Sequence, residues 1–231
     1  MEKIDEAHLD YKEVLRGSHD YILNEKRDAI YKVASSLVSK SWFNSTDIAD
    51  GIGVLLLVWN QAYYRYCNFD LDFDSLEDFL ARNARVLKDF RDREINSLTE
   101  QDEKAIDDLF NDLLNVLKCG DRKSPVAVSK ALHLLAPGFF PLWDDDIAKA
   151  YRCYWEYSEY ASEKYLKFMR KIRLLSQRII LTYSEGKIDQ ITAKREFTEK
   201  VSANLPFVKS MVKILDEYNY AFTKYWHKSS K

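Results

Sequence analysis

Apolar residues recur at spacings of three and four along most of the chain, the period of amphipathic helices that pack one face on a core. The clearest case follows the capping triplet Ser45-Thr46-Asp47 and carries apolar side chains through to Tyr63. We expect this segment to be the central buried helix. The whole pattern predicts about nine helices, at residues 18–39, 45–63, 76–93, 99–118, 125–136, 144–160, 162–184, 189–203 and 206–228.

Capping residues mark several of the expected helix starts. Ser75 followed by Asp78 has the spacing of a capping box, and Ser124-Pro125 combines a cap with a first-turn proline. Residues 68–74 alternate apolar and acidic side chains, as a strand does. Because this segment has no evident partner strand and lies between helices, we predict an extended loop there.

The composition favours an all-α fold. Only 6 Gly and 4 Pro interrupt 231 residues, too few for the many tight turns of a β-sandwich or barrel. With 46% hydrophobic and 31% charged residues the chain is expected to fold around a core of its own. We predict a single compact multi-helix domain over residues 1–231, or alternatively two docked lobes that meet near residue 146.

Charge is divided unevenly along the chain. Residues 1–146 carry 18 Lys and Arg against 28 Asp and Glu, whereas residues 147–231 carry 17 against 9. A basic C-terminal part is compatible with a surface that faces phosphates, on a protein whose net charge is only −2. The alternatives are that the two parts attract each other within one chain, or that two chains pair as a homodimer.

The cysteines and histidines indicate neither a disulfide framework nor a zinc site. Cys67, Cys119 and Cys153 are far apart in the sequence, and the four His show no ligand spacing. The chain begins with an acidic segment unlike a signal peptide, and its longest apolar run is too short to cross a bilayer. We therefore expect a cytoplasmic protein with no metal, no cofactor and no membrane partner.

Residues 124–146 are the segment most suggestive of chemistry. Lys130 lies on an apolar helix, and an aromatic and proline-containing turn then leads to Asp144 at the start of the next helix. The apolar residues of that turn, Phe139 to Trp143, are expected to enter the core and so to fix Asp144 at a helix N-terminus. A lysine amine and a carboxylate held by one rigid turn are suited to nucleophilic or acid–base catalysis.

The same segment resembles the helix-hairpin-helix DNA glycosylase superfamily, in particular its archaeal 8-oxoguanine glycosylase branch. Residues 140–147 resemble the Pro-Val-Asp-x-x-Val turn of that family, with one extra residue between proline and acid. Residues 126–132 resemble its lysine-bearing helix. The resemblance implies a helix-hairpin-helix glycosylase-like core, with Lys130 as the Schiff-base nucleophile and Asp144 as the group that activates it and stabilises the cationic sugar.

A glycosylase flips the damaged base out of the duplex and stacks it on aromatic side chains. The resemblance therefore implies substrate contacts from the aromatic residues near the segment and from one arginine that would bind phosphate. The candidates are Trp59, Tyr63, Trp143, Trp155 and Arg152.

Structural roles explain the same residues in a different way. Lys130 is equally compatible with a solvated helix lysine, Asp144 with an ordinary N-cap, and His133 with a packed core residue. The sequence thus leads to two hypotheses. The first is a DNA N-glycosylase, with lyase activity through Lys130. The second is a non-catalytic helical protein that binds nucleic acid or a protein partner and retains only the fold.

Overall fold

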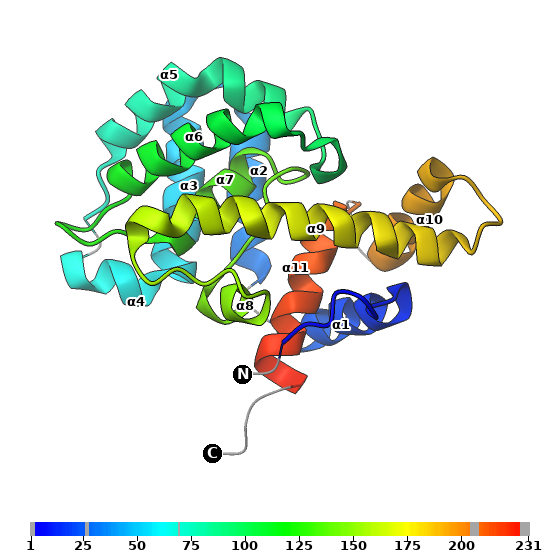
Figure 1. Ribbon diagram of the computed structural model, residues 1–231. Coiled ribbons are helices and arrows are strands. Elements are labelled where there is room, and N and C mark those ends of the chain that lie inside the picture. Colours follow the sequence, from blue (N-terminus) through cyan, green and yellow to red (C-terminus); the bar gives the residue numbers. More distant parts are fainter. Residues whose placement is uncertain (1–2, 26–27, 69, 204–207, 227–231) are drawn as a thin grey trace.

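The computed structural model describes residues 3–25, 28–68, 70–203 and 208–226 (Figure 1). These residues form eleven α-helices and no β-strand, which confirms the all-α prediction with more helices than the nine expected. The helices are α1 Tyr11–Asn24, α2 Asp28–Lys40, α3 Ser45–Trp59, α4 Gln61–Tyr64, α5 Phe73–Arg91, α6 Glu103–Val116, α7 Pro125–Leu135, α8 Asp145–Ala150, α9 Ala161–Ser184, α10 Gln190–Ser202 and α11 Met211–Ala221.

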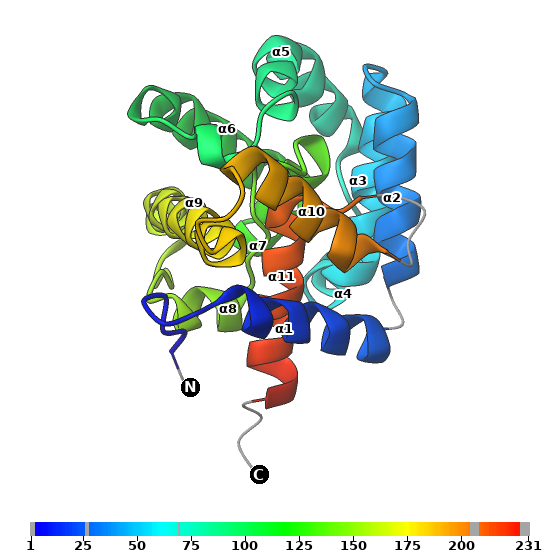
Figure 2. The same cartoon turned by 90° about the vertical axis from the view of Figure 1, so that its right-hand side faces the viewer.

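The helices surround α11, which runs through the middle of the molecule (Figure 2). One side is formed by α2 and α3 and the opposite side by α8 and α9, while α1 crosses α11 near one end. Buried side chains from nearly all helices meet in one core, so the chain is a single compact domain. Within the described ranges, no helix combines the length and the apolarity that crossing a membrane requires.

The predicted central helix is α3, which ends at Trp59 rather than at Tyr63, with Asn60 as its C-cap. Its side chains Ile48, Ile52, Leu55 and Leu56 are fully buried. The side chain of Asn44, one residue before the expected triplet, accepts the N–H groups that cap the helix.

The single helix predicted over residues 18–39 is wrong, because two helices cover this region. The first begins at Tyr11, where Asp10 caps it, and it ends at Asn24 because Glu25 has extended backbone angles. Residues 26–27 of the prediction lie outside the described part of the chain. Three apolar residues within the predicted range, which an amphipathic helix would turn toward the core, are exposed instead: Ile22, Val33 and Leu37.

The helix predicted over residues 144–160 is also wrong, because α8 ends at Ala150. Arg152 has a left-handed backbone (φ 57°), and the Cys153 N–H donates to the Ala148 carbonyl oxygen at 2.8 Å. This is the hydrogen bond of a Schellman motif, which closes a helix and turns the chain away. Arginine occupies the position that glycine usually holds in this motif, so no glycine marks the end of the helix.

Two further helix starts differ from the prediction. Asp72, and not Ser75, caps α5, since its side chain accepts the Ser75 N–H at 2.9 Å. The last helix begins at Met211 rather than at residue 206. Residues 206–207 and 227–228 of that prediction lie outside the described chain.

The expectation that the cysteines stay unpaired is wrong. Cys67 and Cys119 form a disulfide across 52 positions of sequence, with their Cα atoms 5.7 Å apart. Cys153 is a buried free thiol. Spacing in the sequence did not reveal the pair, because it forms only when the turn between α6 and α7 folds back against the end of α4.

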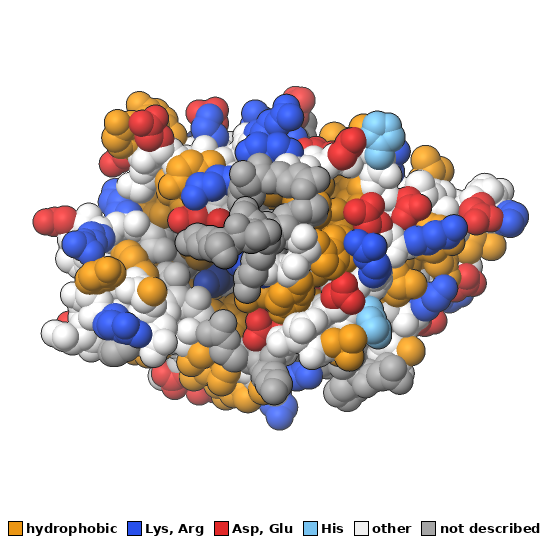
Figure 3. Space-filling view, turned by 90° about the horizontal axis from the view of Figure 1, so that it is seen from below, with side chains coloured by type: hydrophobic (Ala, Val, Ile, Leu, Met, Phe, Trp, Pro, Cys, Tyr) orange, Lys and Arg blue, Asp and Glu red, His pale blue; other side chains and the backbone are white. Residues whose placement is uncertain are grey.

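Ion pairs join the acidic and basic parts of the chain. Lys171 pairs with Glu6, and Arg170, Lys194 and Lys224 pair with acids of the N-terminal part. On the face that carries α1 and α8, acidic and basic side chains are interspersed (Figure 3). These contacts support the alternative that the two parts attract each other within one molecule.

A network of charged side chains is buried along α11. The carboxylate of Glu217, which is fully buried, accepts hydrogen bonds from Ser18 of α1 and from Lys209, whose Nζ lies 2.7 Å away. One turn away, the Lys213 Nζ lies 3.0 Å from Asp216. Burial alone lowers the pKa of Lys213, but Asp216 and the neighbouring acids and tyrosines outweigh burial and hold this pKa well above its ordinary value. Lys213 is therefore charged in the folded protein. The hydrogen bond between Ser18 and Glu217 ties α1 to α11.

Removing the Glu217 carboxylate from the centre of this network should make the protein easier to unfold. We expect Glu217→Ala to lower the free energy of unfolding by about 3–5 kcal/mol, because Lys209 then keeps a buried charge with no partner. Urea unfolding followed by circular dichroism measures this change. The matched control Glu199→Ala, on the exposed side of α10, should change stability by less than about 0.5 kcal/mol. Equal effects of the two variants would contradict the account.

Candidate functional site

A pocket of about 210 Å³ opens between α1, α3, α7, α8 and α11. Both Lys130 and Asp144 line it, and so do Trp59 and Trp143. The lining thus combines aromatic rings with charges of both signs. The other lining residues are Tyr21, Glu25, Leu142, Ile147, Asp216, Tyr220 and Lys224.

Lys130 is positioned by α7 and by the end of α3. Ser124 caps α7 and Pro125 occupies its first turn, as predicted. From this helix the half-buried Lys130 side chain reaches the C-terminal end of α3, where its Nζ donates to the Trp59 carbonyl oxygen at 2.7 Å. That carbonyl is among the last of α3, which have no partner inside the helix. Lys130 is thus neither a fully solvated lysine nor a fully buried one.

Asp144 is positioned by the apolar turn that precedes it. Phe139, Phe140 and Trp143 are almost fully buried, as expected, and so anchor the turn in the core. The Asp144 Oδ1 accepts the Ile147 N–H at 2.8 Å and caps α8, which confirms the predicted capping role.

The second oxygen of Asp144 faces a cation of the last helical turn. Its Oδ2 lies 3.5 Å from the Nζ of Lys224, which also pairs with Asp146. Burial lowers the pKa of Lys224, but the two aspartates outweigh burial and raise it above the ordinary value. The lysine is therefore charged, and it keeps a positive charge beside Asp144 at the pocket wall.

The pocket contains two of the five predicted substrate contacts. Trp59 and Trp143 line it, whereas Tyr63, Trp155 and Arg152 do not. Trp155 stacks on Trp143 with ring centroids 4.6 Å apart, so it supports the pocket wall from outside. Tyr63 instead holds the turn before α7, since its hydroxyl donates to the Arg122 carbonyl oxygen at 2.6 Å.

Sequence reasoning missed the contribution of α1 and α11. Asp216, Tyr220 and Lys224 repeat every four residues and present one polar face to the pocket. Burial raises the pKa of Asp216 by more than the charge of Lys213 lowers it. The available signal was this i, i+4, i+8 series of polar residues on one face of the helical segment.

No group of three or more His, Cys, Asp or Glu among the described residues is arranged to hold a metal ion. Of the consecutive carboxylates Asp144, Asp145 and Asp146, the first and the third both face the ammonium group of Lys224.

His133 is a core residue rather than a catalytic base. It is fully buried, and its Nδ1 lies 2.8 Å from the Phe140 carbonyl oxygen, to which it must donate. Its Nε2 then accepts the hydroxyl of Tyr31, also at 2.8 Å. Burial lowers the pKa of His133 from 6.5 to about 3, so the ring is neutral in the folded protein.

Comparisons of the chain with protein-family models, with curated proteins and with solved structures find no match.

The neutral state of His133 predicts a pH dependence of stability. The unfolded chain binds a proton at this residue below pH 6.5, whereas the folded chain binds it only near pH 3. The free energy of unfolding should therefore fall as the pH drops through this window, by ~1.4 kcal/mol per pH unit from this group alone. Urea unfolding at several pH values measures the slope.

The variant His133→Gln should lose this part of the slope, and the exposed control His19→Gln should keep it. An unchanged slope in His133→Gln would show that the ring is protonated in the core.

Proposed function

We propose that the protein binds DNA and acts as an N-glycosylase of base-excision type, with lyase activity through Lys130. The main observation in support of this proposal is that Lys130 and Asp144 line one pocket together with Trp59 and Trp143. A nucleophilic amine, a carboxylate and aromatic walls are the groups that this chemistry requires. The helix-hairpin-helix glycosylase-like core and the DNA partner belong to the same proposal.

The pocket provides a role for each of these groups. A base flipped out of the duplex stacks on the aromatic walls, and the carboxylates of Glu25 and Asp216 offer acceptors for its N–H groups. The carboxylate of Asp144 stabilises the positive charge that develops on the sugar as the base departs.

The covalent step uses the unprotonated amine of Lys130. The bond between the sugar C1′ and the base breaks, and its electron pair leaves with the base. The lone pair of Nζ forms the new bond to C1′, and the amine loses a proton to water or a pocket carboxylate. The hydrogen bond to the Trp59 carbonyl oxygen orients Nζ through one N–H.

A second candidate is a non-catalytic helical protein that binds nucleic acid or a protein partner. The observation that favours it is that Lys130 and Asp144 both have structural roles, as the partner of a helix-end carbonyl and as a helix cap. The turn before α7 also lacks the Gly-x-Gly of the glycosylase superfamily. For either function we propose a cytoplasmic location.

Borohydride trapping on a duplex with an abasic site tests the enzyme without knowledge of the damaged base. We expect the wild type to form a stable covalent adduct, because reduction of the Schiff base fixes Lys130 to the sugar. Lys130→Ala should form none. Asp144→Asn should retain the cap but trap on the order of a hundredfold more slowly, since the carboxylate that activates the Lys130 amine is gone.

Lys123→Ala is the matched control, because this lysine precedes the same helix but does not line the pocket. It should trap like the wild type. Persistence of the adduct in Lys130→Ala, or its loss in Lys123→Ala, would overturn the assignment. Salt-sensitive duplex binding without any adduct would favour the second candidate.

A further inference from the structure

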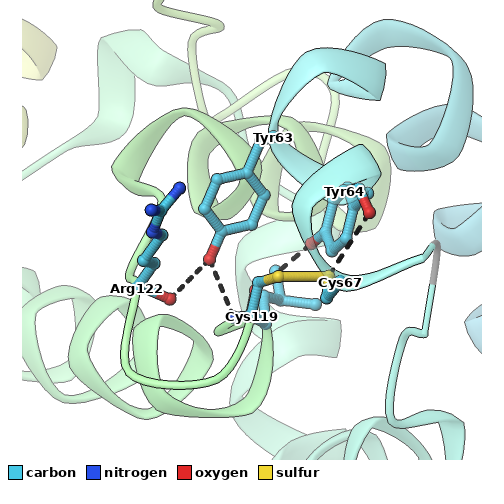
Figure 4. The surroundings of a disulfide bond; sticks show 6 residues. Tyr63, Tyr64, Cys67, Cys119 and Arg122 are labelled. Atoms are coloured by element: carbon cyan, nitrogen blue, oxygen red, sulfur yellow. Dashed lines mark hydrogen bonds between the residues drawn. A yellow bond between two sulfur atoms is a disulfide. The ribbon is translucent and has the colours of Figure 1, made fainter.

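The turn at residues 117–124 is fastened to the end of α4 by one covalent bond and several hydrogen bonds (Figure 4). The disulfide joins Cys67 to Cys119. Beside it, the Tyr63 hydroxyl accepts the Cys119 N–H at 2.9 Å and donates to the carbonyl oxygen of Arg122. The Tyr64 hydroxyl donates to the Leu117 carbonyl oxygen at 3.3 Å. The turn is therefore held at its start and in its middle.

The same two segments continue directly into the pocket wall. Asn60 follows Trp59 at the end of α3, and its side-chain amide donates to the Ser124 hydroxyl at 3.1 Å. Lys130 then donates to the Trp59 carbonyl oxygen. The stretch from Trp59 to Cys67 is thus anchored at one end by pocket contacts and at the other by the disulfide.

The disulfide can be reached from solvent on one side. Cys67 is half-buried, and its neighbours Arg65 and Tyr66 are exposed. Cys119 is only 6% exposed, and Cys153 is buried. A small thiolate therefore meets the Cys67 sulfur first, and Cys119 is the leaving group.

We propose that the Cys67–Cys119 disulfide is a reversible redox modification site that controls how tightly the end of α3 is held against Lys130. Its co-reactants are low-molecular-weight thiols and their disulfides. This inference concerns the pocket whatever its ligand is, so it does not rest on the glycosylase proposal.

The exchange proceeds in two balanced steps. A thiolate attacks the Cys67 sulfur, forms a mixed disulfide and releases Cys119 as a thiolate, which takes up a proton. A second thiolate attacks the sulfur of the small thiol, so Cys67 is released and a small-molecule disulfide forms. The two small thiols supply the two electrons that the protein disulfide gains. In a cytoplasmic protein such a bond is typically transient and redox-sensing.

Reduction should weaken the attachment of the turn at residues 117–124 to the end of α4 without unfolding the turn, because the hydrogen bonds of Tyr63 and Tyr64 remain. Without the covalent link, opening of the turn requires only these bonds to break, and Trp59 moves with the segment that follows it. The amide–hydroxyl contact between Asn60 and Ser124 and the contact of Lys130 with α3 then form for a smaller fraction of the time. The amine of Lys130 becomes more accessible to reagents.

The test measures the rate at which an amine-reactive ester acylates Lys130, by mass spectrometry, in protein oxidised with glutathione disulfide and in protein reduced with glutathione. We expect several-fold faster labelling of Lys130 in the reduced protein. The exposed Lys187, in the turn after α9, should label at the same rate in both forms. Thiol titration in parallel establishes the redox state of each sample.

Two variants distinguish the effect of losing the disulfide from a general destabilisation of the fold. The double variant Cys67→Ser/Cys119→Ser should label like the reduced protein in both buffers. Tyr63→Phe should change the rate little while the disulfide is intact and raise it further once the disulfide is reduced. Equal Lys130 rates in the two redox forms would overturn the inference, as would a disulfide that resists glutathione in the folded protein. Failure of borohydride trapping would bear on the proposed function only.

Discussion

The buried charges of α11 are the constraint on which the rest of the structure depends. A buried carboxylate or ammonium is tolerated only when it is paired and hydrogen-bonded, so Glu217 requires both Ser18 and Lys209 within reach. Meeting that requirement fixes α1 across α11. It also places Lys213 within 4.6 to 5.8 Å of the aromatic rings of Tyr21, Tyr31 and Trp59. Because Asp216 pairs with Lys213, it lies at the pocket. The polar side of the pocket formed by α11 thus follows from the pairing of buried charges in the core.

The contacts of Lys130 and Asp144 also explain how one pair of residues can serve both fold and chemistry. Each side chain makes a short hydrogen bond to a helix end, and such bonds fix a side chain in one orientation. Groups that are held in place before a ligand arrives need little reorganisation when it binds. A structural role for these residues is therefore a condition for the proposed catalysis rather than an argument against it.

Local sequence patterns predicted the parts of the fold that local chemistry decides. The periodicity found α3 and α9, the caps at Ser124 and Asp144 were recognisable, and the burial of the turn before Asp144 followed from its aromatic residues. Contacts between segments that are far apart in the sequence could not be predicted from these local patterns. The Cys67–Cys119 disulfide needs the turn before α7 to return to α4, and α8 ends on a left-handed Arg152 where glycine is usual. Five of the eleven residues that line the pocket belong to α1, to α11 or to the residues just after these helices. The approach of the two helices is set by buried charge and not by spacing.

We propose that Lys130 and Asp144 act on one ligand in one pocket. The most direct measurement is a crystal structure with a short duplex in which a pyrrolidine ring replaces one sugar, because the cationic ring resembles the sugar from which a base has departed. The account predicts that the ring nitrogen lies against the Asp144 carboxylate, with the Lys130 amine beside the adjoining carbon. A duplex bound elsewhere on the protein, with this pocket holding no part of it, would contradict the account.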